Sequence, residues 1–149
     1  MSNLKVQGNA SGAGTTTLQS PNTSTSATLT LPDSTSADTL GYLNAPINEQ
    51  SAAYTAVLAD AGKIIFHPST DANARTFTIP ANGSVAYATG TVLTFINMTS
   101  QVVTIAITTD TMYLAGAGTT GSRSLAQYGI ATAVKMTSTT WLISGTGLT

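Results

Sequence analysis

Three glycines late in the chain have the spacing of a dinucleotide-binding loop. Gly116, Gly118 and Gly121, within the stretch YLAGAGTTGS (113–122), spell G-x-G-x-x-G. Such a loop needs a strand before it, a helix that begins inside it, and an acidic residue about 20 positions later for the ribose. Asp110 is the last acidic residue of the sequence, and the only helical candidate, SRSLAQYG (122–129), is at most two turns long. The glycines are therefore predicted to form a turn between strands, and no cofactor is expected.

The other residues that could do chemistry are few. His67, the single histidine, is close in sequence to Ser69 and Asp71, but the members of a Ser-His-Asp triad come from different elements. With Asp60 or Asp71 it could bind a metal, although no ligand spacing supports such a site. The carboxylates that a glycosidase would need lie in turn-like contexts, where Asp forms caps and Asx-turns: Asp33, Asp38, Asp60 and Asp71. The chain is expected not to be an enzyme.

The composition limits the kind of protein and the kind of site that the chain can form. The chain has 149 residues, enough for one domain with a short appendage. Only 7% of the residues are charged, against about 25% in an ordinary soluble protein, while 42% are hydrophobic. Cysteine is absent, which excludes disulfides and thiolate chemistry. The net charge of −1 and the short apolar runs favour neither a nucleic-acid nor a membrane partner.

Short β-prone segments follow one another from residue 41 onward. We predict strands in YTAVLAD (54–60), KIIFHP (63–68), RTFTIP (75–80), TVLTFINM (91–98), QVVTIAITT (101–109), MYLA (112–115), ATAVKMTS (131–138) and TWLISG (140–145). Turn-forming residues separate them. About eight short strands without helices between them predict an all-β domain at 41–149, an antiparallel β-sandwich or a jelly-roll-like fold.

Residues 1–40 form a different kind of segment. They lack aromatic residues, and their apolar side chains occur in small islands separated by Gly, Ser, Thr, Asn and Pro: Leu4, Val6, Leu18, Leu29 and Leu31. A segment with so little apolar surface cannot fold alone. We therefore expect a short extended β segment that anchors or oligomerises the protein through these five residues.

The aromatic residues divide between core and surface. Trp141, in the strand segment TWLISG, is expected in the core. Tyr113 and Tyr128 flank the glycine loop, and with Arg123 they are the candidates for an outward contact.

Residues 41–149 resemble a module of tailed-bacteriophage virion proteins. The phrases that carry the resemblance are YTAVLADAGKIIFHP, RTFTIPANGSV, TIAITTDTMYLAGAGTTGS and WLISGTG. The resemblance implies a non-enzymatic, β-rich virion protein, often a homotrimer, which is made in the bacterial host cytoplasm and whose partners are its own copies and the major capsid protein or another virion protein.

The short appendage bears on where such a protein would lie. Forty extended residues reach at most about 130 Å, whereas a tail fibre normally carries a long shaft. We therefore expect a capsid decoration protein or a short head fibre, anchored by residues 1–40. The alternative is a tail fibre or a receptor-binding tip that recognises the host surface.

Overall fold

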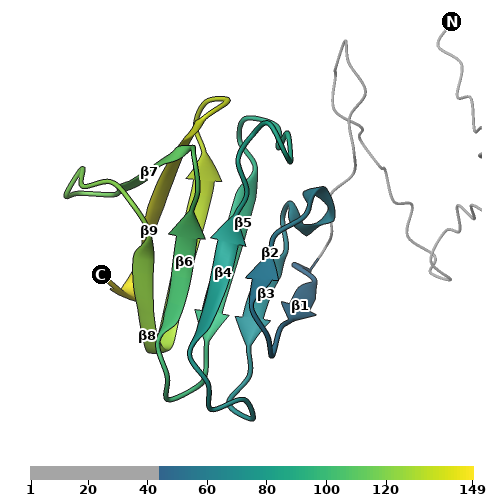
Figure 1. The fold of residues 1–149 in the computed structure, drawn as a ribbon, viewed down its shortest axis with the longest axis vertical. Helices are drawn as coiled ribbons and strands as arrows, with labels where there is room; N and C mark the ends of the chain where they lie inside the picture. The colour runs from purple at the N-terminus through teal and green to yellow at the C-terminus, as the bar shows by residue number, and fades with distance from the viewer. Residues whose placement is uncertain (1–43) are drawn as a thin grey trace, which may run out of the picture. The chain divides into compact units, whose positions relative to one another are not determined.

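Strands joined by loops and turns build the domain that the computed structural model describes, residues 44–149 (Figure 1). In chain order they are β1 (Ile47–Glu49), β2 (Tyr54–Thr55), β3 (Ile64–His67), β4 (Arg75–Ile79), β5 (Val92–Asn97), β6 (Val103–Ile107), β7 (Thr111–Leu114), β8 (Arg123–Lys135) and β9 (Thr140–Leu148). A single turn of 3-10 helix, η1 (Leu58–Asp60), lies between β2 and β3. The predicted all-β class is confirmed.

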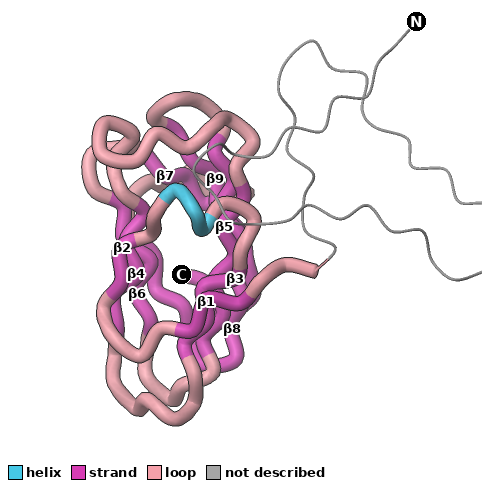
Figure 2. The backbone as a smooth tube through the Cα atoms, turned by 90° about the vertical axis from the view of Figure 1, so that its right-hand side faces the viewer, coloured by secondary structure: helices cyan, strands magenta, loops and turns pink. Residues whose placement is uncertain are grey.

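The strands form one curled sheet that is folded into two layers. Layer A has the order β1-β3-β5-β8-β9-β7, and layer B has the order β2-β4-β6-β8. Figure 2 shows the layers end-on, with β2, β4 and β6 on one side and β1, β3, β5 and β8 on the other. The long strand β8 belongs to both, because residues 129–134 pair with β5 and residues 123–125 pair with β6.

The direction of the strands differs from the antiparallel arrangement that we expected. From β1 to β6 the chain enters the two layers alternately, so that neighbours within a layer run parallel: β1 with β3, β3 with β5, β2 with β4, and β4 with β6. Parallel neighbours need a crossover, which is usually a helix; here the crossover is a strand of the opposite layer. Among the pairs of named strands within residues 44–149, only those that involve β8 are antiparallel.

Alternation along the strands places the core between the layers. In β4, Phe77 and Ile79 point inward while Thr76 and Thr78 point outward. The fully buried side chains come from both layers: Ile65, Leu93, Phe95 and Ile143 from layer A, and Phe77, Ile79, Val103 and Ile105 from layer B. The predicted core position of Trp141 is confirmed, since its side chain is fully buried.

A bend in β8 closes the two layers against each other. Its pairing with β9 shifts between Leu125 and Ile130, and Tyr128 within the bend has a φ of 58°, a conformation that is uncommon for residues other than glycine. The buried side chain of Asn97, at the end of β5, donates to the carbonyl oxygen of Leu125 at 3.0 Å. The helical candidate at 122–129 is not a helix, because these residues belong mainly to β8.

The N-terminal predictions fall outside the described residues. The segment 1–40 and its five apolar residues, Leu4, Val6, Leu18, Leu29 and Leu31, therefore stay predictions. No helix within residues 44–149 has the length and the apolar character needed to cross a membrane.

Candidate interaction surface

The two layers present chemically different outer faces. On layer B, the outward side chains are small and mostly hydroxylated: Thr55, Thr76, Thr78, Thr104, Ala106 and Ser124. On layer A, the outward positions carry large apolar side chains together with Thr94, Thr132, Ser144 and Thr146. We call the apolar members the apolar face: Ile47, Ile64, Phe66, Val92, Ile96, Tyr113, Ile130, Val134 and Leu142. Layer A therefore presents more large apolar side chains on its outer side than layer B does.

The strand register arranges the apolar face in continuous rows. One row runs from Phe66 on β3 through Ile96 on β5 to Ile130 on β8. Another runs from Val92 on β5 through Val134 on β8 to Leu142 on β9, and Tyr113 on β7 follows. Within each row the side chains are neighbours across paired strands, whereas Thr94, Thr132 and Ser144 lie between the two rows. Exposed rows of apolar side chains of this kind are candidates for interaction sites.

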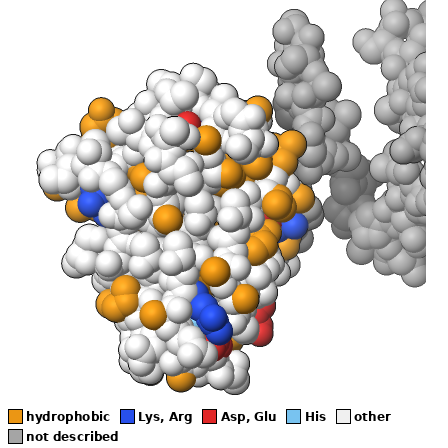
Figure 3. All heavy atoms as spheres, viewed as in Figure 1, with side chains coloured by type: hydrophobic (Ala, Val, Ile, Leu, Met, Phe, Trp, Pro, Cys, Tyr) orange, Lys and Arg blue, Asp and Glu red, His pale blue; other side chains and the backbone are white. Residues whose placement is uncertain are grey.

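Much of this apolar area is open to solvent. The exposed fractions are 66% for Ile47, 45% for Ile130, 40% for Tyr113 and 39% for Leu142. Within the described strands of layer A, the charged side chain that points outward is Glu49, on the edge strand β1. Because the outer side of layer A carries so little charge, two copies of this face can approach without like-charge repulsion. Figure 3 shows the opposite, layer B side of the domain, where a few isolated charged groups lie in a largely neutral surface.

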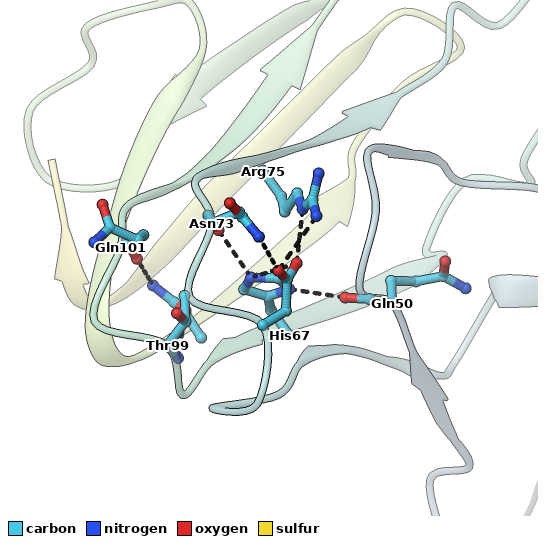
Figure 4. Close-up of polar contacts among 8 residues, drawn as sticks. Gln50, His67, Asn73, Arg75, Thr99 and Gln101 are labelled. Carbon is cyan, nitrogen blue, oxygen red and sulfur yellow. Dashed lines mark hydrogen bonds and ion pairs between the residues drawn. The ribbon is translucent and has the colours of Figure 1, made fainter.

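A polar cluster at the end of β3 contains His67 and Asp71, two of the three residues considered for a catalytic triad (Figure 4). His67 is fully buried. Its Nδ1 lies 2.8 Å from the carbonyl oxygen of Gln50, and its Nε2 lies 3.2 Å from that of Asn73. Both ring nitrogens are thus engaged by the backbone, and neither is left to act as a base for Ser69. The ring holds two loops together.

The charged members of this cluster also interact with one another. Arg75 donates from Nε to Asp71 at 2.7 Å and from Nη2 at 3.2 Å, and the Asn73 amide donates to the same carboxylate. The hydrogen bond from Arg75 is the main cause that lowers the pKa of Asp71, and the hydrogen bond from Asn73 lowers it further. The Asp71 carboxylate in turn raises the pKa of Arg75. Asp71 and Arg75 therefore brace the loop between β3 and β4.

The second candidate metal ligand, Asp60, serves as a buried hydrogen-bond acceptor. It accepts from Asn48 at 3.0 Å, from the Tyr54 hydroxyl at 2.7 Å and from the backbone N–H of Val57 at 2.9 Å. Burial and the hydrogen bond to Asp60 raise the pKa of Tyr54, and burial raises the pKa of Tyr87. Across residues 44–149, no group of three or more His, Cys, Asp or Glu side chains is placed to hold a metal ion.

The glycine loop connects two strands. It joins β7 to β8, with Gly116, Gly118 and Gly121 at positive φ, and the N–H of Leu114 donates to Thr119 across it at 2.8 Å. The glycines are needed there because L side chains rarely adopt such backbone angles. The predicted turn between strands is confirmed.

The structure brings two of the three predicted contact residues to this loop. Tyr113 forms a β-bridge with Thr120, and Arg123 donates to the Thr119 carbonyl and hydroxyl oxygens. Tyr128 lies instead at the bend of β8, where 71% of its side chain is exposed. Their role in outward contact stays a prediction.

Sequence reasoning missed most of the apolar face. It selected Tyr113, but the aliphatic members such as Ile96 and Ile130 were treated as ordinary strand residues. The signal was present in strands with apolar residues at successive positions, such as KIIFHP and TVLTFINM, because a strand with one solvated face usually alternates strictly.

Comparisons of the chain with protein-family models, with curated proteins and with solved structures give no match.

Proposed function

We propose that this chain is a non-enzymatic structural protein of a bacteriophage particle that assembles with copies of itself through the apolar face. The observation that supports self-assembly is the exposure of isoleucine, leucine and tyrosine side chains in rows on the outer side of layer A, whereas the outward strand positions of layer B carry small, mostly hydroxylated side chains. Burying one isoleucine or leucine side chain contributes about 1.5–3 kcal/mol. Several such side chains in each copy would offset the entropy lost on association.

The location on a particle rests on the sequence resemblance. Two of the phrases that carry it are YTAVLADAGKIIFHP, which covers β2, η1 and β3, and RTFTIPANGSV, which covers β4 and its following loop. The proposed form is a homotrimer that decorates the capsid or forms a short head fibre. Residues 1–40 would then attach it to the major capsid protein or another virion protein by adding strands to a partner's edge.

One observation favours the second candidate, a tail fibre or receptor-binding tip. Tyr128 has a largely exposed aromatic side chain on a backbone with φ of 58°. Backbone conformations of this kind cluster at ligand-binding sites, and exposed tyrosines are common at interfaces. A tip that reads the host surface would use such a residue, whereas a purely decorative coat would not need it.

The self-assembly part is tested by light scattering on a sizing column. We expect a mass three times 15.1 kDa for the full chain at micromolar concentration. A monomer that persists at the highest soluble concentration would contradict the proposal.

The particle part is tested by labelling purified virions with an antibody against the chain. Label on the head supports decoration, label on the tail supports the second candidate, and an unlabelled virion contradicts both. Deletion of residues 2–40 should leave a folded domain that no longer binds particles lacking the protein. Undiminished binding of the truncated chain would place the anchor in residues 41–149 instead.

A further inference from the structure

A buried lysine lies against an asparagine side chain in the interior of the domain. Lys135, the last residue of β8, is only 1% exposed, and its Nζ lies 2.7 Å from Oδ1 of Asn82. Asn82 follows β4, so the contact joins the end of a layer A strand to the loop that leaves layer B. The two residues are 53 positions apart in the sequence.

The surroundings of this contact are aromatic. Lys135 Nζ lies 5.4 Å from the centre of the Trp141 ring and 5.9 Å from that of the Tyr87 ring. The two rings meet edge to face at 5.7 Å. Aromatic walls of this kind exclude water from the amine, whereas Asn82 is half-buried.

Lys135 lacks the partner that a buried ammonium group normally has. Within residues 44–149 the ion pairs are those of Asp71 with His67 and with Arg75. Asp110 contacts Asn82 rather than Lys135. Its two carboxylate oxygens accept from the backbone N–H of Asn82 at 3.2 and 3.3 Å. A buried charge without a counter-ion is costly, and a reaction that removed it would be favourable.

The geometry allows that reaction. The carbonyl bond of Asn82 is about 1.2 Å long, which places its Cγ within about 3.9 Å of Nζ. Reacting atoms in a near-attack arrangement are about 3–3.5 Å apart, so a small movement of either side chain suffices. Asp110 holds the backbone of Asn82 and thereby limits the movement of the amide.

We propose that Lys135 and Asn82 form an intramolecular isopeptide bond. Lysine amines are established protein nucleophiles once deprotonated. The new bond joins Nζ of Lys135 to Cγ of Asn82, and the bond from Cγ to Nδ2 breaks. Starting from the ammonium form, one proton stays on the new amide nitrogen and two leave with Nδ2 as an ammonium ion. The step needs no oxidant, reductant or cofactor, and it replaces the buried charge by a neutral amide.

The bond would link the two layers covalently. β8 already pairs with β5 and β6, and the bond would fix its C-terminal end to the connection after β4. The bond would keep the end of β8 attached to this connection even after strand pairs had begun to separate, so the domain would resist complete unfolding.

Mass spectrometry of the full-length folded protein tests the proposal. The intact mass should fall short of the sequence mass by one ammonia. Trypsin should then release residues 76–123 joined to residues 124–149, because an acylated Lys135 is not cleaved. Lys135→Arg and Asn82→Ala should each restore the sequence mass and abolish the joined peptide. Lys63→Arg, at the start of β3, is the matched control and should keep both signals.

One other reaction would cause the same loss of mass. Asn82 precedes Gly83, and attack by the Gly83 backbone nitrogen on the asparagine side chain also releases ammonia, forming a cyclic imide. Gly83→Ala hinders that attack, and the space around Gly83 is open, so the variant should fold and still give the joined peptide. Loss of ammonia without a joined peptide, or an unchanged sequence mass in the folded wild-type protein, would overturn the proposal.

Discussion

Ile96 on β5 and Ile130 on β8 lie directly opposite each other across an antiparallel pair, on the outer side of layer A. Ile130 is 45% exposed, and Phe66 extends the same row on β3. Side chains paired in this way form a smooth apolar surface, since opposite residues on one face of an antiparallel pair are in contact. This pair forms part of one row of the apolar face.

Replacing Ile130 by glutamate should therefore prevent self-association. A carboxylate in this row of the apolar face would have to be desolvated on assembly. We expect the dissociation constant of the oligomer to rise at least about tenfold, equivalent to about 1.4 kcal/mol, as measured by sedimentation or light scattering over a dilution series. Thr76→Glu, on the exposed outer face of layer B, is the control. Equal weakening by both variants would show that the apolar face is not the interface.

Asn97 should be essential for the stability of the folded domain. Its buried amide donates to the carbonyl oxygens of Gln101 at 2.8 Å and Leu125 at 3.0 Å, and accepts from the N–H of Thr99 at 3.0 Å. Asn97→Ala would leave these buried groups unpaired, so the free energy of unfolding in urea should fall by about 3 kcal/mol. Gln101→Ala keeps the backbone acceptor and should cost less than about 0.5 kcal/mol. Similar losses in the two variants would contradict this account.

The Asp71–Arg75 pair should make stability sensitive to acid. The pKa of Asp71 lies below its ordinary value of 3.8 in the folded state, because Arg75 and Asn73 donate to the carboxylate. Its stabilising contribution is present above that ordinary value and is lost as the pH falls through the lower, folded-state pKa. The free energy of unfolding should therefore decrease less between pH 5 and pH 2 in Asp71→Asn than in the wild type. The same decrease in both proteins would show that the pair does not contribute.

Gly145 should not tolerate a side chain. A Cβ added there would lie 2.6 Å from Cα of Ala131 and closer still to the carbonyl oxygen of Ile130, both backbone atoms of the adjacent β8. Gly145→Ala must push β9 away from β8, and we expect a loss of about 3 kcal/mol in the free energy of unfolding. Gly83→Ala meets no neighbouring atom and should melt close to the wild type. A Gly145→Ala protein as stable as the wild type would mean that the strands separate freely.

Local chemistry was enough to locate most of the strands. The segments with β-branched and aromatic residues, such as RTFTIP and TVLTFINM, correspond to β4 and β5, because short runs of these residues bounded by turn formers pack well on a pleated sheet. The short strand β1 was missed, since INE carries only one apolar side chain. Its pairing with β3 defines it.

The sequence by itself also determined that the glycine loop is a turn, because the residues that a nucleotide site requires are missing from the chain. Strand direction was decided by the tertiary structure. A strand with one buried face alternates in the same way whether its neighbour is parallel or antiparallel, so Phe77 and Ile79 could not reveal that β4 runs parallel to β6. The tertiary structure also decided which residues contact Lys135, since Asn82 lies beside the lysine only when the two layers pack together. Contacts between residues far apart in the sequence depend on the fold, and no local pattern encodes them.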